Sequence, residues 1–189
     1  LVFTIVLIVF VGLPEICFVA FSEQKELKSS SSSKVIVGWL ERVYLPREGF
    51  ALKGKMDTGA KNSSIHAMEI EYLPNNSKVN SPRVRFKVID IKKEYRIIEA
   101  ELLGKAKIKR PKPSGESKVT IDLETRPMVE LEICLAGITK RIPVNLTNRA
   151  GMNYPLILGR SALEGDFIVD VSKKFIYSSS SKCVKNEKQ

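Results

Sequence analysis

The sequence of 189 residues predicts a mainly β domain, closed or strongly curved, with one short helix near its C-terminal end. Five stretches alternate apolar and polar residues or are rich in residues with high β propensity, as strands are. They are residues 35–40, 50–56, 83–90, 95–102 and 128–135. Residues with turn chemistry lie between them, at 74–77, 90–94 and 136–139. One late stretch, residues 159–164, has a helical pattern.

The expected folded domain, residues 35–177, lies between two polar stretches. Residues 23–34 contain five consecutive serines and predict a flexible linker. Residues 178–189 form a similar polar tail, which we expect to be disordered.

Residues 1–22 differ from the rest of the chain in being almost free of charge. Residues 1–11 are almost wholly apolar, and Glu15 is the only charged residue up to Ser22. This run is shorter than the roughly 20 apolar residues of a membrane span and is typical of a secretory signal. We therefore expect cleavage after Ser22 and a periplasmic or secreted protein. No Lys or Arg precedes the apolar run, so an uncleaved anchor in the inner membrane, facing the periplasm, is the alternative.

The formal net charge of +10 limits the classes of partner. Basic chains bind nucleic acids, anionic surfaces or acidic substrates. Here the lysines are scattered and are not interleaved with stacking aromatic residues, so we expect no nucleic-acid partner.

Two of the three cysteines lie beyond the N-terminal segment. Cys134 lies in an apolar alternation and predicts a thiol in the core, whereas Cys183 lies in the polar tail. A disulfide between them is the alternative in an oxidising compartment, although two cysteines do not make a disulfide framework.

The residues with the clearest chemistry are Asp57, Thr58 and Gly59, directly after an apolar strand. A turn capped by aspartate is the ordinary interpretation of such a triplet. A second element favours another one: residues 156–158 are apolar and precede Gly159 and the helical pattern. In aspartic peptidases an apolar strand ending in glycine packs against the Asp-Thr-Gly loop, because glycine allows a close backbone approach.

Several longer motifs occur in the same order as in one known family. They are Gly38-Trp39, residues 57–67, Thr125-Arg126-Pro127, residues 146–149, Met152, Tyr154-Pro155 and residues 158–163. Over residues 37–171 the chain resembles bacterial proteins that carry the label ATP-dependent zinc protease and have a retropepsin-like fold.

The resemblance implies an aspartic endopeptidase that acts as a homodimer on peptides or proteins. Asp57, Thr58 and Gly59 would be catalytic, with the two Asp57 carboxylates sharing one proton. Residues that would bind substrate or support the site are Ala60, Lys61, His66, Arg126, Arg149, Gly159 and Arg160. For Arg126 and Arg149 a structural salt bridge and a contact to an acidic substrate are equal alternatives. For His66 the alternatives are a bond to loop backbone and a substrate-contacting or pH-sensing role.

The residues support neither zinc nor ATP. The chain has one histidine and no His-Glu-x-x-His motif, and neither Cys134 nor Cys183 has a second cysteine at ligand spacing. No phosphate-binding Gly-x-x-x-x-Gly-Lys-Ser/Thr loop occurs. We therefore expect no metal and no cofactor.

The sequence departs from viral retropepsins at two places. Those proteins have acidic residues after the catalytic triplet, where this chain has Lys61 and Asn62, so Arg160 needs another partner and the substrate rim is more basic. The stretch from Asp57 to Gly159 is also long, which predicts an extra hairpin or enlarged flap. Gly104 and Gly115 are the candidates for its mobile turns.

Two other functions remain open at this stage. The domain could bind a peptide or a partner without turnover. It could also hydrolyse amide bonds other than ordinary peptide bonds, since the family is associated with glutamate-ligase and transglutaminase-like proteins.

Overall fold

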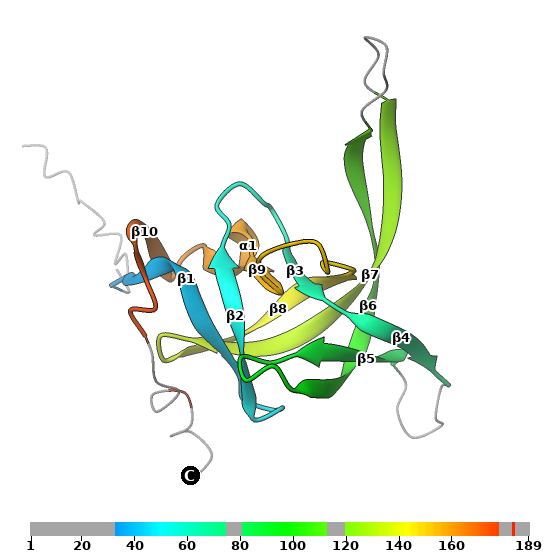
Figure 1. Cartoon of the computed structure of the whole chain (residues 1–189), viewed down its shortest axis with the longest axis horizontal. Helices are drawn as coiled ribbons and strands as arrows, with labels where there is room; N and C mark the ends of the chain where they lie inside the picture. Colours follow the sequence, from blue (N-terminus) through cyan, green and yellow to red (C-terminus); the bar gives the residue numbers. More distant parts are fainter. Residues whose placement is uncertain (1–32, 75–80, 113–119, 178–182, 184–189) are drawn as a thin grey trace, which may run out of the picture. The chain divides into compact units, whose positions relative to one another are not determined.

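The computed structural model (Figure 1) describes residues 33–74, 81–112, 120–177 and Cys183. In these residues ten strands and one short helix follow one another. The strands are β1 Val35–Leu45, β2 Phe50–Met56, β3 Ser63–His66, β4 Met68–Leu73, β5 Arg83–Ile89, β6 Tyr95–Lys112, β7 Thr120–Leu135, β8 Ile138–Thr147, β9 Leu156–Leu158 and β10 Phe167–Lys174. The helix is α1 Arg160–Leu163. The predicted fold class, mainly β with one short helix near the C-terminus, is confirmed.

The strands pair in the order β10-β1-β2-β9-β3-β8-β7-β6-β5-β4. A further antiparallel contact, Tyr44 to Cys134, joins β1 to β7. Because β1 and β7 are also the ends of the run β1-β2-β9-β3-β8-β7, this contact closes a ring of strands, as predicted. β6, β5 and β4 continue the sheet beyond the ring, and β10 lies at its other edge (Figure 1).

Alternation along the strands fills the interior. In β5, Val84, Phe86 and Val88 are buried, and the basic residues between them are half-buried on the opposite face. The ring contributes further fully buried side chains, among them Leu45, Leu52, Ile65, Ile133, Leu146 and Leu158. Each such side chain stabilises the fold by about 1.5–3 kcal/mol relative to an exposed one.

The predicted extra hairpin is present as β6 and β7. Residues 105–112 of β6 pair with residues 120–127 of β7 and with no other described strand, so this part forms a two-stranded arm (Figure 1). At the base of the arm the register shifts between Leu102 and Gly104, and Gly104 has φ +133°. Gly115 lies outside the described residues.

Several predicted boundaries were wrong. The strands expected at 35–40, 95–102 and 128–135 are longer, and the turn expected at 136–139 ends before β8, which begins at Ile138. β3, β4, β8 and β10 were not predicted as strands, whereas the apolar strand expected at residues 156–158 is present as β9. Proline and charged residues interrupt the pattern of β6, β7 and β8, where cross-strand hydrogen bonds override weak local propensity.

Of the two interpretations of Cys134, the structure shows the alternative, a disulfide, and not a free core thiol. Cys134 forms a disulfide with Cys183, with 5.8 Å between their Cα atoms. Cys134 is indeed buried, at 1% exposure, but the polar tail brings a cysteine to it. Residues 1–22, expected to be a signal or an anchor, the expected linker up to residue 32 and the rest of the tail lie outside the described residues. In the part that is described, no helix is long and apolar enough to cross a membrane.

Candidate active site

Asp57 begins the loop between β2 and β3, where β2 runs beside β9. Met56 pairs with Leu158 in a parallel register, and the backbone N–H of Asp57 donates to the carbonyl oxygen of Leu158 at 2.8 Å. The predicted packing of residues 57–59 against residues 156–158 is confirmed.

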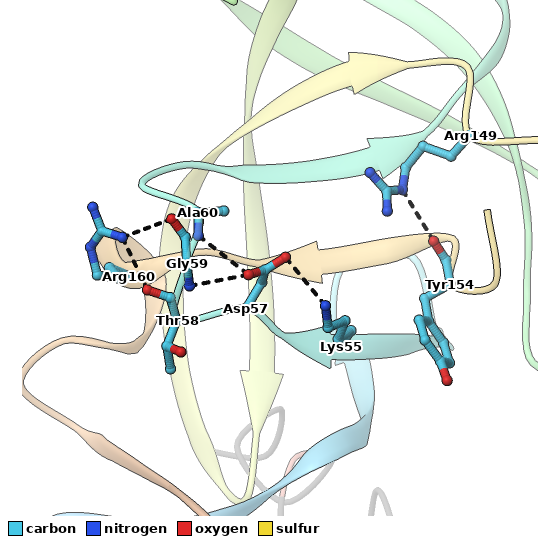
Figure 2. Close-up of polar contacts among 8 residues, drawn as sticks. All are labelled: Lys55, Asp57, Thr58, Gly59, Ala60, Arg149, Tyr154 and Arg160. Carbon is cyan, nitrogen blue, oxygen red and sulfur yellow. Dashed lines mark hydrogen bonds and ion pairs between the residues drawn. The ribbon is translucent and has the colours of Figure 1, made fainter. Parts of the chain in front are cut away.

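The Asp57 carboxylate is partly exposed and has a partner on each oxygen (Figure 2). Oδ1 accepts the backbone N–H groups of Gly59 at 3.2 Å and Ala60 at 3.3 Å. Oδ2 lies 3.6 Å from Nζ of Lys55. Oδ1 is thus held by the backbone of its own loop, and Oδ2 lies next to Lys55.

Gly159 allows the loop to approach β9 and α1 closely. A Cβ atom there would lie 2.6 Å from the carbonyl carbon of Asn62 and 2.8 Å from the carbonyl oxygen of Lys61. No side chain fits this space without moving backbone. The N–H of Gly159 donates to Oγ of the buried Ser63 at 3.2 Å.

Arg160 holds the loop from the α1 side (Figure 2). Its Nη1 donates to the carbonyl oxygens of Thr58 at 3.0 Å and Gly59 at 2.9 Å, and its backbone N–H donates to Ala60 at 2.9 Å. The partner that the sequence left open for Arg160 is therefore the backbone of the loop itself. Lys61 is exposed, and its carbonyl oxygen accepts the N–H of Ser161 at 3.1 Å.

His66 and Arg149 meet on the other side of Asp57. Nδ1 of His66, a residue that is 8% exposed, accepts the backbone N–H of Arg149 at 2.8 Å. Nε of Arg149 donates to the carbonyl oxygen of Tyr154 at 3.1 Å (Figure 2). The structure thus gives His66 the first of its two predicted roles, a bond to loop backbone.

Arg126 forms the structural ion pair that was one of its two alternatives. Its Nη2 lies 2.8 Å from Oε2 of Glu124, and its side chain is 11% exposed. Arg126 also lies close enough to affect Arg149: burial first, and then the charge of Arg126, lower the pKa of Arg149, while Asp57 raises it. These three charged groups therefore lie in one neighbourhood.

Asp57 lines one cavity, and a second cavity shares the residues Arg149, Met152 and Asn153 with it. The first, of about 300 Å³, is lined by Lys55, Asp57, Arg149, Gly151, Met152, Asn153, Tyr154 and Ile157. The second, of about 600 Å³, also contains the side chains of Arg42, Lys53, His66 and Lys93, with Asp90 as its acidic residue. Positive charge therefore outweighs negative charge in both cavities.

The sequence interpretation missed Lys53 and Lys55 as candidates for the site. Both precede Asp57 by an even number of residues in a strand, and residues so spaced share a face. That spacing was the available signal, but lysines in strands are usually only solvated.

The donor set does not fit a zinc ion. Among the described residues no three His, Cys, Asp or Glu side chains form a group that could hold a metal ion. Nδ1 of His66, the histidine of this chain, is already bonded to Arg149.

Comparisons with known proteins agree with this geometry. The family model described as retropepsin-like aspartic endopeptidase RimB matches residues 36–180. The crystal structure of a protein of unknown function from Legionella pneumophila is similar, with 34% identity and a TM-score of 0.61, over 76% of this chain and 98% of that one.

Curated relatives are longer proteins. A probable alpha-L-glutamate ligase from Shewanella pealeana is 33% identical over 77% of this chain, and one from Parasynechococcus marenigrum is 30% identical over 72%. The chain spans about 30% of the length of the first of these relatives and 28% of the second. None of these descriptions repeats the label ATP-dependent zinc protease. The match over residues 36–180, together with the Asp57 loop held by β9 and Arg160, shows that the chain belongs to the RimB-like family of retropepsin-like proteins.

Proposed function

We propose that the chain is one subunit of a homodimeric aspartic endopeptidase whose two Asp57 carboxylates activate a water molecule. The observation that carries this proposal is the way the loop is held. β9 and Arg160 fix it from behind, while Thr58 and Gly59 are exposed. A rigid, exposed loop is suited to meeting its own copy across a two-fold axis, and the description of the matched family supports this chemistry.

The proposed reaction needs only the two carboxylates and water. Carboxylates at contact distance share one proton, because both cannot ionise cheaply. The ionised carboxylate takes a proton from water as the water oxygen attacks the carbonyl carbon of the substrate, and the protonated one donates its proton to the carbonyl oxygen. The C–N bond then breaks as the amine nitrogen takes a proton from one carboxyl group and a hydroxyl of the tetrahedral intermediate gives its proton to the other carboxylate, which restores the shared proton. Thr58 would bond across the dimer axis, and Gly59 would leave room for the peptide backbone.

Acidic peptides are the substrates that the surroundings of Asp57 favour. Lys55 and Arg149 line the first cavity, and Arg42, Lys53 and Lys93 line the second. The relatives' name, alpha-L-glutamate ligase, concerns glutamate and supports the same substrate class. The ligase activity itself belongs to proteins of which this chain covers about 30%, so we do not extend it to this chain.

A peptide-binding module without turnover is the second candidate. The ion pair between Asp57 Oδ2 and Lys55 Nζ, at 3.6 Å, favours it, because this oxygen already has a cationic partner within the same chain. Hydrolysis of other amide bonds would use the same residues as the peptidase.

We also propose that the protein is exported to the periplasm or beyond. The disulfide between Cys134 and Cys183 supports this, because such bonds persist mainly in oxidising compartments.

Replacing Asp57 tests the proposed chemistry. Asp57→Asn keeps the shape of the side chain but removes its capacity to take a proton, so peptide cleavage is expected to fall by about a hundred- to ten-thousand-fold or more. Glu101→Gln is the matched control, since Glu101 is an exposed residue of β6. The measurement is cleavage of a library of acidic and neutral peptides by wild type and both variants.

Two measurements, dilution and treatment with a chelator, distinguish the aspartic peptidase from the other candidates. Specific activity should fall on dilution, because a monomer holds half of the site, and it should survive a strong metal chelator. Chelator-sensitive activity that persists in Asp57→Asn would refute the aspartic mechanism. Peptide binding without cleavage at any pH would favour the binding module.

A further inference from the structure

His66 connects the two ends of the loop formed by residues 149–155. Its backbone N–H donates to the carbonyl oxygen of Pro155 at 2.6 Å, and its imidazole Nδ1 accepts the N–H of Arg149 at 2.8 Å. Two bonds close the loop internally, from Arg149 Nε to Tyr154 O and from Met152 N to Arg149 O. One residue of β3 thus fixes the start and the end of this loop.

The same loop forms much of the wall of the cavity at Asp57. Arg149, Gly151, Met152, Asn153 and Tyr154 line that cavity. Any change in the bond between His66 and Arg149 therefore moves the wall that a substrate would contact.

We propose that His66 is a positioning residue whose neutral imidazole holds the 149–155 loop against the Asp57 cavity, and that protonation of Nδ1 releases the loop. The effect on catalysis rests on the proposed peptidase function. The positioning of the loop by His66 does not depend on that function.

The chemistry of the imidazole explains the release. In the neutral tautomer that carries its proton on Nε2, Nδ1 is an acceptor, and in the protonated ring both nitrogens are donors. Protonation therefore places an N–H against the N–H of Arg149, and the bond is lost. It also adds a positive charge beside Arg149, whose guanidinium bonds the same loop at Tyr154.

Most of the charged groups that share a cavity with His66 are basic. The cavity that His66 lines also holds Arg42 from β1, Lys53 from β2, Asp90 and Lys93 from the turn between β5 and β6, and Arg149 from the loop itself. Asp90 is bound by Nε of Arg96 at 3.0 Å and by the N–H groups of Lys92 and Glu94.

The surroundings of His66 determine in which direction pH changes the bond between His66 and Arg149. Burial first, and then the charge of Arg149, lower the pKa of His66 from its ordinary value, while a backbone hydrogen bond at Thr147 acts in the opposite direction. Because the folded pKa is lower than the unfolded one, protons bind more tightly to the released or unfolded chain. The loop is therefore held above about pH 6.5, the ordinary value for histidine, and is released as the pH falls through the folded pKa.

The protein contains an intrinsic fluorescent probe of the position of the 149–155 loop. Its single tryptophan, Trp39, packs edge-on against the ring of Tyr154, with the ring centroids 5.8 Å apart and an interplanar angle of 82°. Movement of the loop changes this contact, so the fluorescence of Trp39 should report release.

The test follows Trp39 fluorescence against pH in wild type, His66→Asn and His66→Phe, with the imidazole titration of wild type measured by NMR. The asparagine side chain can place a carbonyl acceptor near the position of Nδ1, and it does not titrate. The phenylalanine variant has no acceptor. Wild type should show a transition whose midpoint equals that of the imidazole, His66→Asn should show none, and His66→Phe should resemble the released state at every pH.

A transition that persists unchanged in His66→Asn, or an imidazole that titrates without any change at Trp39, would refute the proposal. If His66→Phe does not fold, the comparison of wild type with His66→Asn still decides. Where peptide cleavage is detected, His66→Phe should raise KM roughly tenfold, the effect of one lost bond to a buried group, with a smaller change in kcat, and His66→Asn should restore KM. An inactive wild type that shows the fluorescence transition would refute the peptidase and leave the role of His66 intact.

Discussion

Single residues around Asp57 act mainly by fixing backbone. Arg160 bonds two carbonyl oxygens of the loop, and Gly159 allows the loop to lie against β9. The catalytic candidate therefore depends on neighbours whose side chains do no chemistry. This is a common way to hold a reactive group in a narrow range of positions.

Gly159→Ala tests the close approach at residue scale. The added Cβ would meet backbone atoms of Asn62 at 2.6–2.7 Å, which cannot rotate away. We expect a loss of about 1–3 kcal/mol in the free energy of unfolding, as for other overpacked sites, and loss of any cleavage activity. Gly151→Ala is the control, because nothing lies within 4 Å of a Cβ there. Equal stability of the two variants in urea unfolding would contradict the argument.

At the scale of elements, one buried carboxylate joins β1 to residues 176–177, which follow β10. Glu41 is 0% exposed, and Oε1 accepts the N–H groups of Gly38 at 2.7 Å and Ile176 at 3.0 Å. Oε2 accepts the N–H of Tyr177 at 3.2 Å. β10 pairs in parallel with β1, which shifts register between Gly38 and Leu40. Glu41 thus supplies hydrogen-bond acceptors for backbone N–H groups that strand pairing at this edge leaves without one.

Glu41→Gln should destabilise the domain by about 2–3 kcal/mol, the scale of hydrogen bonds to a charged group. The amide replaces one acceptor oxygen with a donor that faces backbone N–H groups. The free energy of unfolding in urea measures the effect, and Glu101→Gln, in an exposed part of β6, serves as the control. Protection of the Ile176 and Tyr177 amides from hydrogen exchange should fall in Glu41→Gln. Unchanged protection would contradict the role of Glu41.

At the scale of the whole described domain, two contacts close the fold. The contact between Tyr44 and Cys134 closes the ring of strands. The disulfide from Cys134 to Cys183 then joins β7 to the C-terminal segment across 49 residues of sequence. Both contacts involve Cys134, so β1 and the C-terminal segment are attached to β7 at the same residue.

Cys183→Ser should lower the melting temperature. In the chain-entropy description, a bridge across about 50 residues contributes about 4 kcal/mol by restricting the unfolded chain. Wild type treated with a reductant should melt like the variant, and the reductant should not change the melting of Cys183→Ser. Identical melting of oxidised wild type and variant would show that the bridge does not stabilise the domain.

Local sequence patterns were sufficient for the core of the site. The alternation of residues 50–56, the apolar residues 156–158 and the glycine at position 159 predicted that the Asp57 loop would pack against residues 156–158, and it does. These features depend on the burial period of a strand and on the absence of a Cβ atom, which short windows of sequence express directly.

The partners of the charged residues were decided only by the tertiary structure. His66 and Arg149 are 83 residues apart, Arg160 and Thr58 are 102 apart, and Glu41 and Ile176 are 135 apart. No periodicity in the sequence specifies such pairs, because they form when the ring of strands closes and buries polar groups that must then find partners. The sequence by itself determined which residue could be catalytic. The closed sheet decided what holds that residue in place.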